Sequence, residues 1–329
     1  MRRVVLLILL VLPCGAARRG AHEPRKHAPA AFTAEDVTNA TQTDPLNPGD
    51  TGARVLRAQI LLDRARFSPG EIDAQFGQNL SAAVAGYRRS NGLPAGQAID
   101  ADVWNLLNRD SAPLLQTYTI SPADVKGPFQ PLPKDVHERA KLRALGYESA
   151  AEELGEKFHV SPKMLALLNP GKGFEQAGVE ITVPNVQRPV APAAAKIVVS
   201  ESASTVTAMS ADGKILAQYP ATIGGLHDPL PLGSWTVRSI DHNPVFYYQP
   251  GRLWNADPAD AKEKLPPGPN NPVGVVWIGL SKKHYGIHGT PDPSLIRRSE
   301  SSGCIRLTNW DAEDLSHMAS RGTPVTLEQ

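Results

Sequence analysis

The feature of this sequence that most limits its fold is a change of pattern at residues 186–196, "VQRPVAPAAAK". Before it, apolar residues recur at helical spacing, whereas after it short β-branched runs are separated by turn signals. A stretch rich in proline and alanine between two such patterns is typical of a linker. The sequence therefore predicts a multidomain protein, in which a helical part and a mainly-β part are joined by a linker over residues 187–195.

The first 17 residues have the pattern of an exported protein. Two arginines precede an apolar run over residues 4–12, and small residues follow it. This run is shorter than the roughly 20 apolar residues of a membrane-spanning helix. We therefore expect a cleaved signal peptide over residues 1–17, no membrane span after cleavage, and a location in the periplasm or cell envelope. Lipidation of Cys14 is the alternative to this cleavage.

Residues 18–50 are polar, contain several prolines and have no apolar periodicity, so the sequence predicts a tether that does not fold alone. The charges of the whole chain are balanced, with 34 basic and 33 acidic residues and a net charge of +1. We therefore expect neither nucleic acid nor an anionic membrane surface as a partner.

Residues 51–110 contain three short segments with helical spacing of apolar residues. In the first segment Val55 and Ile60 belong to the apolar face. The second helix is expected to stop at Gly92, and Asp100 is a suitable N-cap for the third. These segments predict a small three-helix domain.

The same residues resemble a peptidoglycan-binding domain of the PGBD type. The likeness rests on the "GEIDAQFG" turn of residues 70–77, an Ala-Val pair in the second helix, a Gly-Leu pair after it and a "WNLL" end. Ala74 stands where the family usually has glycine, and Arg88 where it usually has glutamine. These departures concern the affinity for the glycan that the resemblance implies, and not the fold.

Residues 115–186 follow a βααβ order. A strand-like "QTYTI" is followed by two helical segments, the second of which begins at Ser161 and ends at Asn169, and "VEITVP" is the last strand. This order resembles a LysM module, a small glycan-binding fold, although the Gly-Asp-Thr turn of that family is absent. Two interpretations remain open: a glycan-binding module, and a structural adaptor that no longer binds glycan.

Residues 196–329 are expected to be mainly antiparallel strand, because runs such as "KIVVS", "STVTAMS" and "GSWTVRSI" alternate with turn signals. One helix is predicted near the end, capped by Thr308 and stopped by Gly322. The turn-rich stretch over residues 247–272 is expected to border a cleft. The tryptophans, Trp277 among them, are expected to pack in the core or its rim, and an aromatic wall of the substrate site is the alternative.

A cysteine and a histidine are the candidate catalytic residues. After signal cleavage Cys304 is the only thiol, so it cannot form an internal disulfide. A thiol attacks as the thiolate and needs a neighbour that takes its proton, which the imidazole of His288 can do. On a strand, His284 and His288 share a face, and a Ser-Gly-Cys turn can present backbone N–H groups to an oxyanion. Together these groups predict acyl transfer.

The strings "HGTP" and "SESSGCIRLTNWD", with "DPLPLGSWTV" and "NPVG" before them, resemble the signature of the L,D-transpeptidase catalytic domain, the YkuD family. The resemblance implies a β-sandwich-like catalytic domain over residues 196–329. It implies that Cys304 is the nucleophile, that His288 is the base and then the acid, and that the carbonyl of Gly289 orients the imidazole. The backbone N–H groups of Gly303 and Cys304 are implied as the oxyanion hole.

The resemblance also assigns substrate contacts to Thr290, Ser301, Ser302 and Arg306. For Ser301 a turn-forming hydrogen bond is an equal alternative, and for Arg306 a supporting ion pair is favoured over a substrate carboxylate. Many members have histidine in place of Ser302, so activation of the thiol is left to a single imidazole. Many have glycine in place of Arg297, which adds bulk and charge near the loop over the site.

The implied reaction cleaves a peptidoglycan stem peptide between diaminopimelate and a terminal D-alanine and transfers the acyl group to an amine of a neighbouring stem. The implied partner is peptidoglycan, through its stem peptides and its glycan, with no cofactor and no metal. Three alternatives remain: transfer to water, a noncatalytic wall-binding protein, and a zinc site of His284, His288 and Cys304. His137 and His159, in the second module, are poor site candidates.

Overall fold

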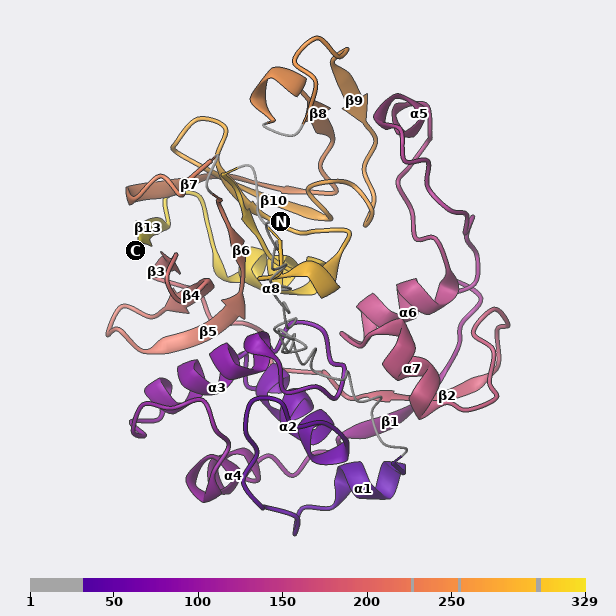
Figure 1. Ribbon diagram of the computed structural model, residues 1–329, viewed down its shortest axis with the longest axis vertical. Helices are drawn as coiled ribbons and strands as arrows, with labels where there is room; N and C mark the ends of the chain where they lie inside the picture. Colours follow the sequence, from indigo (N-terminus) through magenta and orange to yellow (C-terminus); the bar gives the residue numbers. More distant parts are fainter. Residues whose placement is uncertain (1–31, 226–227, 254–255, 300–302) are drawn as a thin grey trace, which may run out of the picture.

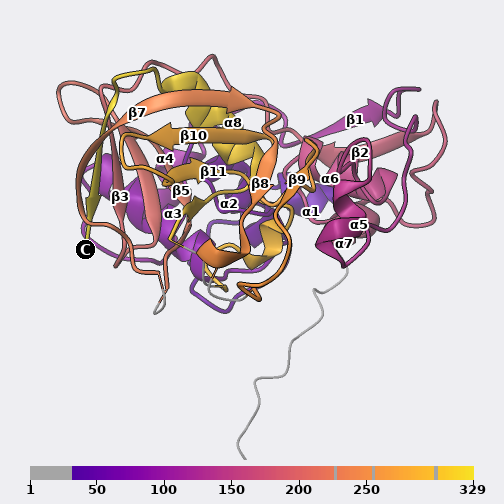
Figure 2. The ribbon, with the colours of Figure 1, turned by 90° about the horizontal axis from the view of Figure 1, so that it is seen from above.

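The computed structural model describes residues 32–225, 228–253, 256–299 and 303–329. Its elements form three parts that lie against one another: helices at the bottom of Figure 1, a smaller α+β module at the right, and a large curled sheet at the top. Seen from above, the small module lies to one side of the sheet (Figure 2). None of the helices in the described ranges combines the length and the apolarity that a membrane crossing requires.

The helical part forms because short amphipathic segments end at local stop signals. Asp100 accepts a hydrogen bond from the N–H of Val103 (3.1 Å) and caps a helix, as predicted. Gly92, with φ 67°, lies just beyond the end of the preceding helix, also as predicted. Val55 and Ile60 are fully buried in the core. The helices are α1 (Ala34–Thr38), α2 (Ala53–Arg64), α3 (Gln78–Ser90) and α4 (Ala101–Leu107).

Part of the segment that was predicted as a tether is folded onto these helices. Val37 of α1 is fully buried, and Leu46 forms an antiparallel bridge with Ile99. Both side chains belong to the core of the helical part, although two isolated apolar residues give no periodicity in the sequence. The tether prediction therefore does not hold for residues 33–50. The predicted signal peptide lies outside the described residues.

The second module has the predicted order of strands and helices, with one helix added in the insertion between the first strand and the helix pair. The two strands pair antiparallel. Ser161 caps the last helix through the N–H of Met164 (3.1 Å). Ile72 of the helical part bridges to Val160, and the two parts share one hydrophobic core. The elements are β1 (Leu115–Thr119), α5 (Val136–Ala140), α6 (Ala150–Lys157), α7 (Pro162–Leu168) and β2 (Glu180–Pro184).

The third part is built on one nine-stranded sheet that curls until it nearly closes. Its strands are β3 (Lys196–Ser200), β4 (Thr205–Met209), β5 (Ile215–Pro220), β6 (Thr222–Ile223), β7 (Gly233–His242), β10 (Val276–Leu280), β11 (Gly286–His288), β12 (Ile305–Arg306) and β13 (Pro324–Glu328). The strand order is β5-β4-β3-β13-β7-β10-β11-β12-β6, so the two edge strands are separated in the chain only by Ala221. The first half of β7 pairs with β13 and its second half with β10. A mainly-β, barrel-like fold thus replaces the two separate sheets of the predicted sandwich.

A separate hairpin stands above this sheet (Figure 1). It consists of β8 (Phe246–Tyr248) and β9 (Glu263–Leu265), which pair antiparallel within the stretch that was predicted to border a cleft. The short 3-10 turn η1 (Pro250–Arg252) lies between its strands, and a second, η2 (Pro293–Leu295), follows β11.

Helix α8 (Asn309–Met318) begins at the predicted cap, where the hydroxyl of Thr308 accepts from the N–H of Asp311 (3.1 Å). It ends before the predicted stop at Gly322. The chain is already extended at Ala319 (φ −91°, ψ 157°), and Gly322 (φ 97°) lies in the turn that leads into β13.

The helical part docks directly on the edge of the sheet, where α3 lies beside β5 (Figure 1). The side-chain amide of Gln218 in β5 donates to the carbonyl of Ala82 (2.8 Å) and accepts from Nη2 of Arg89 (2.9 Å). A Cβ on Gly86 would lie 2.4 Å from this amide. Glycine at this position therefore allows the helix to approach the strand.

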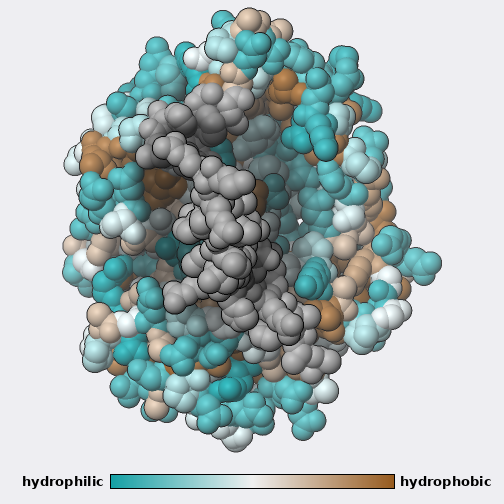
Figure 3. All heavy atoms as spheres, viewed as in Figure 1, coloured by the Kyte–Doolittle hydropathy of each residue, from teal (hydrophilic) through white to brown (hydrophobic). Residues whose placement is uncertain are grey.

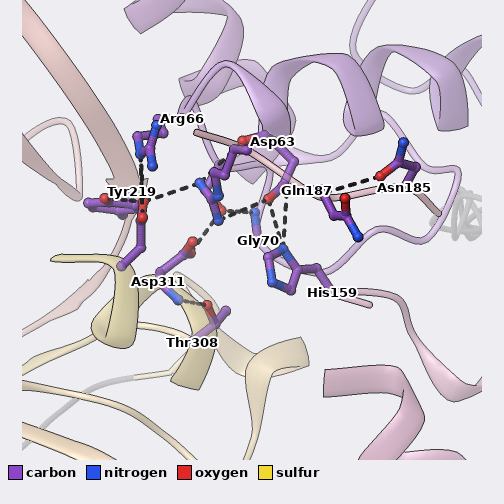
Figure 4. Close-up of polar contacts among 12 residues, drawn as sticks. Asp63, Arg66, Gly70, His159, Asn185, Gln187, Tyr219, Thr308 and Asp311 are labelled. Atoms are coloured by element: carbon purple, nitrogen blue, oxygen red, sulfur yellow. Dashed lines mark hydrogen bonds and ion pairs between the residues drawn. The ribbon is translucent and has the colours of Figure 1, made fainter. Parts of the chain in front are cut away.

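Buried polar side chains connect the three parts where they meet (Figure 4). Asp63 of α2 is fully buried, and its Oδ2 lies 3.1 Å from Nδ1 of His159. Arg188, in the predicted linker, donates to the carbonyl of Asp63 (3.2 Å), and its Nη1 lies 3.2 Å from Oδ2 of Asp314. The hydroxyl of Tyr219 in β5 donates to the same carboxylate (2.7 Å). The junction network comprises Asp63, Arg66, His159, Arg188, Tyr219 and Asp314.

Candidate active site

Two parallel strands bring the candidate cysteine and histidine to one face of the sheet. β11 and β12 pair with Ile287 opposite Ile305 and His288 opposite Arg306. Both isoleucines are fully buried in the core, so the residues on either side of them point to the opposite face. Cys304 and His288 therefore share that face, although they are far apart in the chain.

His288 is held in one orientation by its neighbours. It is 4% exposed, its Nδ1 lies 2.7 Å from the carbonyl oxygen of Gly289, and its ring stacks on that of Trp277 with 5.5 Å between centroids. Because a carbonyl oxygen only accepts, Nδ1 carries the hydrogen and Nε2 is left as the acceptor. Burial, with a smaller contribution from the charge of Arg306, lowers the pKa of His288 to about 3. The imidazole is therefore neutral near pH 7 and can act as a base.

Cys304 is partly exposed and directly precedes β12. Burial raises the pKa of its thiol, while a backbone hydrogen bond from Gly286 and the charge of Arg306 act in the opposite direction. Its Sγ atom lies 3.8 Å from the carbonyl oxygen of His284. The resting site thus combines a neutral thiol with a neutral imidazole, and not a thiolate with an imidazolium.

Both side chains line a cleft of about 1230 Å³. Trp277 and Arg306 border it on the sheet, the β8–β9 hairpin forms a second side, and residues of α5 form a third. The prediction that residues 247–272 border a cleft is therefore confirmed. A cleft that contains a thiol and a histidine with a shifted pKa has the features of a site for acyl transfer.

The comparisons with known proteins identify the family of the part of the chain that contains these residues. The family model of the L,D-transpeptidase catalytic domain, YkuD, matches residues 194–327. "Putative L,D-transpeptidase YkuD" of Bacillus subtilis is 30% identical over 173 residues, which cover 52% of this chain and 89% of that protein. The chain belongs to the YkuD L,D-transpeptidase family.

A second curated protein and a solved structure are also similar to this chain over about half of its length. The protein of the same name in Bacillus licheniformis is 29% identical over 178 residues, or 54% of this chain and 92% of that protein. The crystal structure of L,D-transpeptidase 3 from Mycobacterium tuberculosis in complex with a faropenem-derived adduct is 22% identical. This match covers 48% of the present chain and 76% of the mycobacterial chain, with a TM-score of 0.35.

The helical part has a family match of its own. Residues 51–107 match the model described as "Putative peptidoglycan binding domain", so the prediction from the "GEIDAQFG" turn is confirmed. Neither this match nor that of the catalytic domain extends to residues 115–186. The LysM resemblance of the second module therefore rests on its order of strands and helices.

Of the two predicted substrate-contact residues in the described ranges, Thr290 and Arg306, the structure brings one to the cleft. Arg306 lines it. Thr290 is buried, and its hydroxyl accepts from the N–H of Asp292 (3.3 Å) within a turn, outside the lining of the cleft. Ser301 and Ser302 lie outside the described residues.

Two positions near the site have left-handed backbone conformations. Gly303 has φ 81°, and a Cβ there would lie 3.1 Å from the ring of Tyr285, so glycine fits directly before the cysteine. Arg297 has φ 64°, which agrees with the glycine that many family members have at this position. Its Nη1 donates to the carbonyl of Gln78 in the helical part (2.7 Å). The charge that was expected near the substrate therefore serves a contact between two parts of the protein.

The two histidines of the zinc alternative do not share a strand. β11 begins at Gly286, and His284 precedes it in a turn with φ 71°. Nδ1 of His284 lies 2.9 Å from Nη1 of Arg252. No group of three His, Cys, Asp or Glu side chains in the described ranges is arranged to hold a metal ion. The argument for zinc from a shared strand face is therefore wrong.

Sequence reasoning missed three residues that support His288 in its position. Trp277 stacks on His288 and does not merely pack in the core or its rim. Asn309, the first residue of α8, accepts from the N–H of Val275 (3.2 Å) and donates to both carboxylate oxygens of Glu156 (2.9 and 3.0 Å). Glu156 belongs to α6, and burial raises its pKa to about 8. The second module thus helps to fix the segment beside His288, a contact that only tertiary packing reveals.

Replacing Gly289 with alanine is expected to disturb this support. A Cβ at this position would lie 2.2 Å from Oδ1 of Asn309, so the side chain that donates to Glu156 must shift. We expect the free energy of unfolding to fall by about 2 kcal/mol and turnover to fall with it. Urea unfolding and turnover assays measure both effects. Gly146→Ala is the control, because nothing lies within 4 Å of a Cβ there; equal losses in the two variants would contradict the expectation.

Proposed function

We propose that the protein is a cysteine-dependent L,D-transpeptidase that forms cross-links between peptidoglycan stem peptides. The observation that carries this proposal is the state of His288, a neutral imidazole that donates from Nδ1 to Gly289 and keeps Nε2 as an acceptor. Its strand, β11, pairs with β12, which begins directly after Cys304, and the two residues lie on one face. Membership of the YkuD family supports the same reaction.

In the first half-reaction the proton on Sγ of Cys304 passes to Nε2 of His288 while the sulfur attacks the carbonyl carbon of the L-residue. The backbone N–H groups of Gly303 and Cys304 bind the oxyanion of the tetrahedral intermediate. The C–N bond then breaks, and the imidazolium gives its proton to the leaving amine. The terminal D-residue, typically D-alanine after diaminopimelate, departs and leaves a thioester on the enzyme.

In the second half-reaction an amine of a neighbouring stem peptide attacks the thioester carbon. His288 accepts the proton of the amine, the C–S bond breaks, and the proton returns to the sulfur of Cys304. The cycle is therefore closed and requires no metal or organic cofactor. The choice of acceptor decides the product, because water in place of the amine yields a shortened peptide.

The proposal locates this reaction at the cell wall. The peptidoglycan-binding domain provides one contact with the wall polymer, and the LysM-like module is a candidate for a second. Since the substrate lies outside the cytoplasm, we expect the protein in the periplasm or cell envelope. The signal-peptide pattern of residues 1–17 agrees with this location.

Incubation with a disaccharide-tetrapeptide, followed by mass spectrometry, tests the proposal. We expect the native protein to produce a cross-linked dimer and a free D-amino acid, and Cys304→Ala to produce neither. Tripeptide without dimer would instead identify a carboxypeptidase that uses water. Binding to sacculi without any product would identify a noncatalytic wall-binding protein and would overturn the proposal.

A further inference from the structure

The second module reaches the catalytic cleft through α5. Lys134, Val136 and Arg139 border the cleft on the side of the β8–β9 hairpin. Figure 1 shows α5 at a distance from the remainder of its own module and beside β9. Helix α5 and strand β9 are in contact. This helix lies in the insertion that distinguishes the module from a plain βααβ unit. A segment that precedes the catalytic domain in the chain therefore completes the wall of its cleft.

His137 fixes α5 to the hairpin. Its Nδ1 lies 2.7 Å from Oε1 of Glu263 in β9, and its Nε2 lies 2.8 Å from Oδ1 of Asp260. The hydroxyl of Tyr248 in β8 donates to the other oxygen of Asp260 (3.1 Å). The hydrogen bonds to Glu263 and Asp260, with a smaller effect of Asp135, raise the pKa of His137. His137, predicted from the sequence to be a poor site candidate, thus positions the wall of the cleft.

The charges around the cleft favour an anionic ligand. Hydrophilic side chains predominate where α5 and β9 lie on the face of Figure 1 (Figure 3). Cationic side chains outnumber carboxylates in the described lining, which contains Lys134, Arg139, Arg252, Lys283 and Arg306 but only two aspartates, Asp228 and Asp241. An excess of one sign in a cleft attracts ligands of the opposite sign.

The two cations of the α5 segment are available to such a ligand. Nε of Arg139 donates to the carbonyl of Pro133 (2.5 Å), which orients the guanidinium and leaves its Nη atoms to bind elsewhere. Within the described part of the chain, no carboxylate forms an ion pair with Arg139 or Lys134. Arg139 is half-buried, between the cleft and a second cavity of about 550 Å³. A partly desolvated cation gains more from a bound anion than an exposed one.

We propose that Arg139 and Lys134 bind a carboxylate of the stem peptide, so that the second module takes part in selecting the substrate of the catalytic domain. The inference rests on the proposed function, because it takes the stem peptide as the ligand of this cleft. Diaminopimelate and the terminal residue both carry carboxylates. The guanidinium of Arg139 suits such a group because its parallel N–H bonds match the two carboxylate oxygens. Lys134 adds a second charge from the same wall.

Binding to the Cys304→Ala protein tests the inference without turnover. Titration calorimetry compares the disaccharide-tetrapeptide with an analogue in which the carboxylates are amides. In this background, the added substitutions Lys134→Gln and Arg139→Gln are expected to raise the Kd of the free acid about tenfold, with little change for the amide. Arg143→Gln, which removes an exposed cation of the same module outside both cavities, is the control and is expected to leave both Kd values unchanged.

Turnover separates failure of this inference from failure of the proposed function. If the native protein forms dimer but the Lys134 and Arg139 variant binds acid and amide with unchanged Kd, the carboxylate contact is overturned and the reaction stands. An equal loss of affinity for acid and amide would also overturn it, because the variant would then have damaged the wall and not a charge contact. If the native protein forms no product and Cys304→Ala without further substitutions does not bind the disaccharide-tetrapeptide, the result would count against both proposals. Circular dichroism and the unfolding midpoint verify that each variant is folded.

Discussion

Replacing His288 with glutamine is expected to lower the rate of Cys304 acylation by about 10²–10⁴-fold, the usual contribution of a positioned general base. Glutamine has a similar volume, but its amide does not take up the thiol proton. Labelling of Cys304 by a carbapenem, followed by mass spectrometry over time, measures the rate of acylation. His284→Gln is the matched control, because His284 is exposed at the rim of the same cleft. Equal rates for the two variants would contradict the role of His288.

The dependence of acylation on pH gives a second test of the same pair. Since the pKa of His288 is lowered to about 3 and that of Cys304 is raised, both groups are neutral across the range from pH 5 to 7. The proton then moves during the attack, and the rate is expected to stay level as the pH falls from 7 to 5. Protonation of the imidazole reduces the rate only near its own pKa. A fall in rate centred between pH 6 and 7 would instead indicate that the imidazole of His288 has an ordinary pKa and is not lowered by burial.

Burial of this imidazole also has a consequence for stability. An unfolded histidine with a pKa near 6.5 takes up a proton at a pH where His288 in the folded protein does not. The unfolded state therefore binds more protons below pH 6.5, and the free energy of unfolding decreases as the pH falls through that range. The His288→Gln variant removes this contribution, so its stability is expected to depend less on pH between 6.5 and 4.

Local signals in the sequence were sufficient to predict most of the helices and strands. The caps provided by Asp100, Ser161 and Thr308 each bond to an N–H three residues further along the chain. Such contacts depend only on neighbouring residues, so the same pattern predicts them in any fold. Gly322 failed as a stop signal, because the turn into β13 already requires an extended chain at Ala319.

Site residues that are distant in the chain were predicted to lie together only where a family motif contains both of them. The pairing of β11 with β12, which brings Cys304 to the face of His288, was reached through the family signature and not through periodicity. No motif records the bond between His137 and Glu263, which lie 126 positions apart, so the wall formed by α5 was missed. The contribution of Glu156 to the catalytic domain was missed for the same reason.

The junction network leads to the second large effect. Replacing Arg188 with alanine is expected to lower the free energy of unfolding by about 3 kcal/mol, because it removes one partner of a buried ion pair. The side chain of Arg188 is 9% exposed and lies near Asp63, which is fully buried, and Asp314, which is 13% exposed. The cost comes from leaving two carboxylates with less compensating charge in a site that water scarcely reaches. Urea unfolding monitored by tryptophan fluorescence measures it.

Arg54→Ala is the matched control for this prediction, because its pair with Asp44 is solvated. The side chains of Arg54 and Asp44 are 32% and 82% exposed, so loss of the pair is expected to cost less than about 1 kcal/mol. Similar losses in the two variants would contradict the importance of burial at the junction.

The difference between native protein and Arg188→Ala is expected to depend on pH in a definite direction. Burial acts to raise the pKa of Asp63, but the charges of His159, Arg188 and Arg66 outweigh it, and the pKa lies below its ordinary value. A lowered carboxyl pKa stabilises the folded state above the unfolded pKa of about 3.9, and the effect is lost as the pH falls through the folded value. Without Arg188 the pKa of Asp63 lies closer to its ordinary value, because one of the charges that lower it is gone. The difference in the free energy of unfolding between the two proteins should therefore be fully developed at pH 7 and become smaller below pH 4. A difference that stays constant down to pH 2 would mean that Arg188 stabilises the junction through packing and not through its charge.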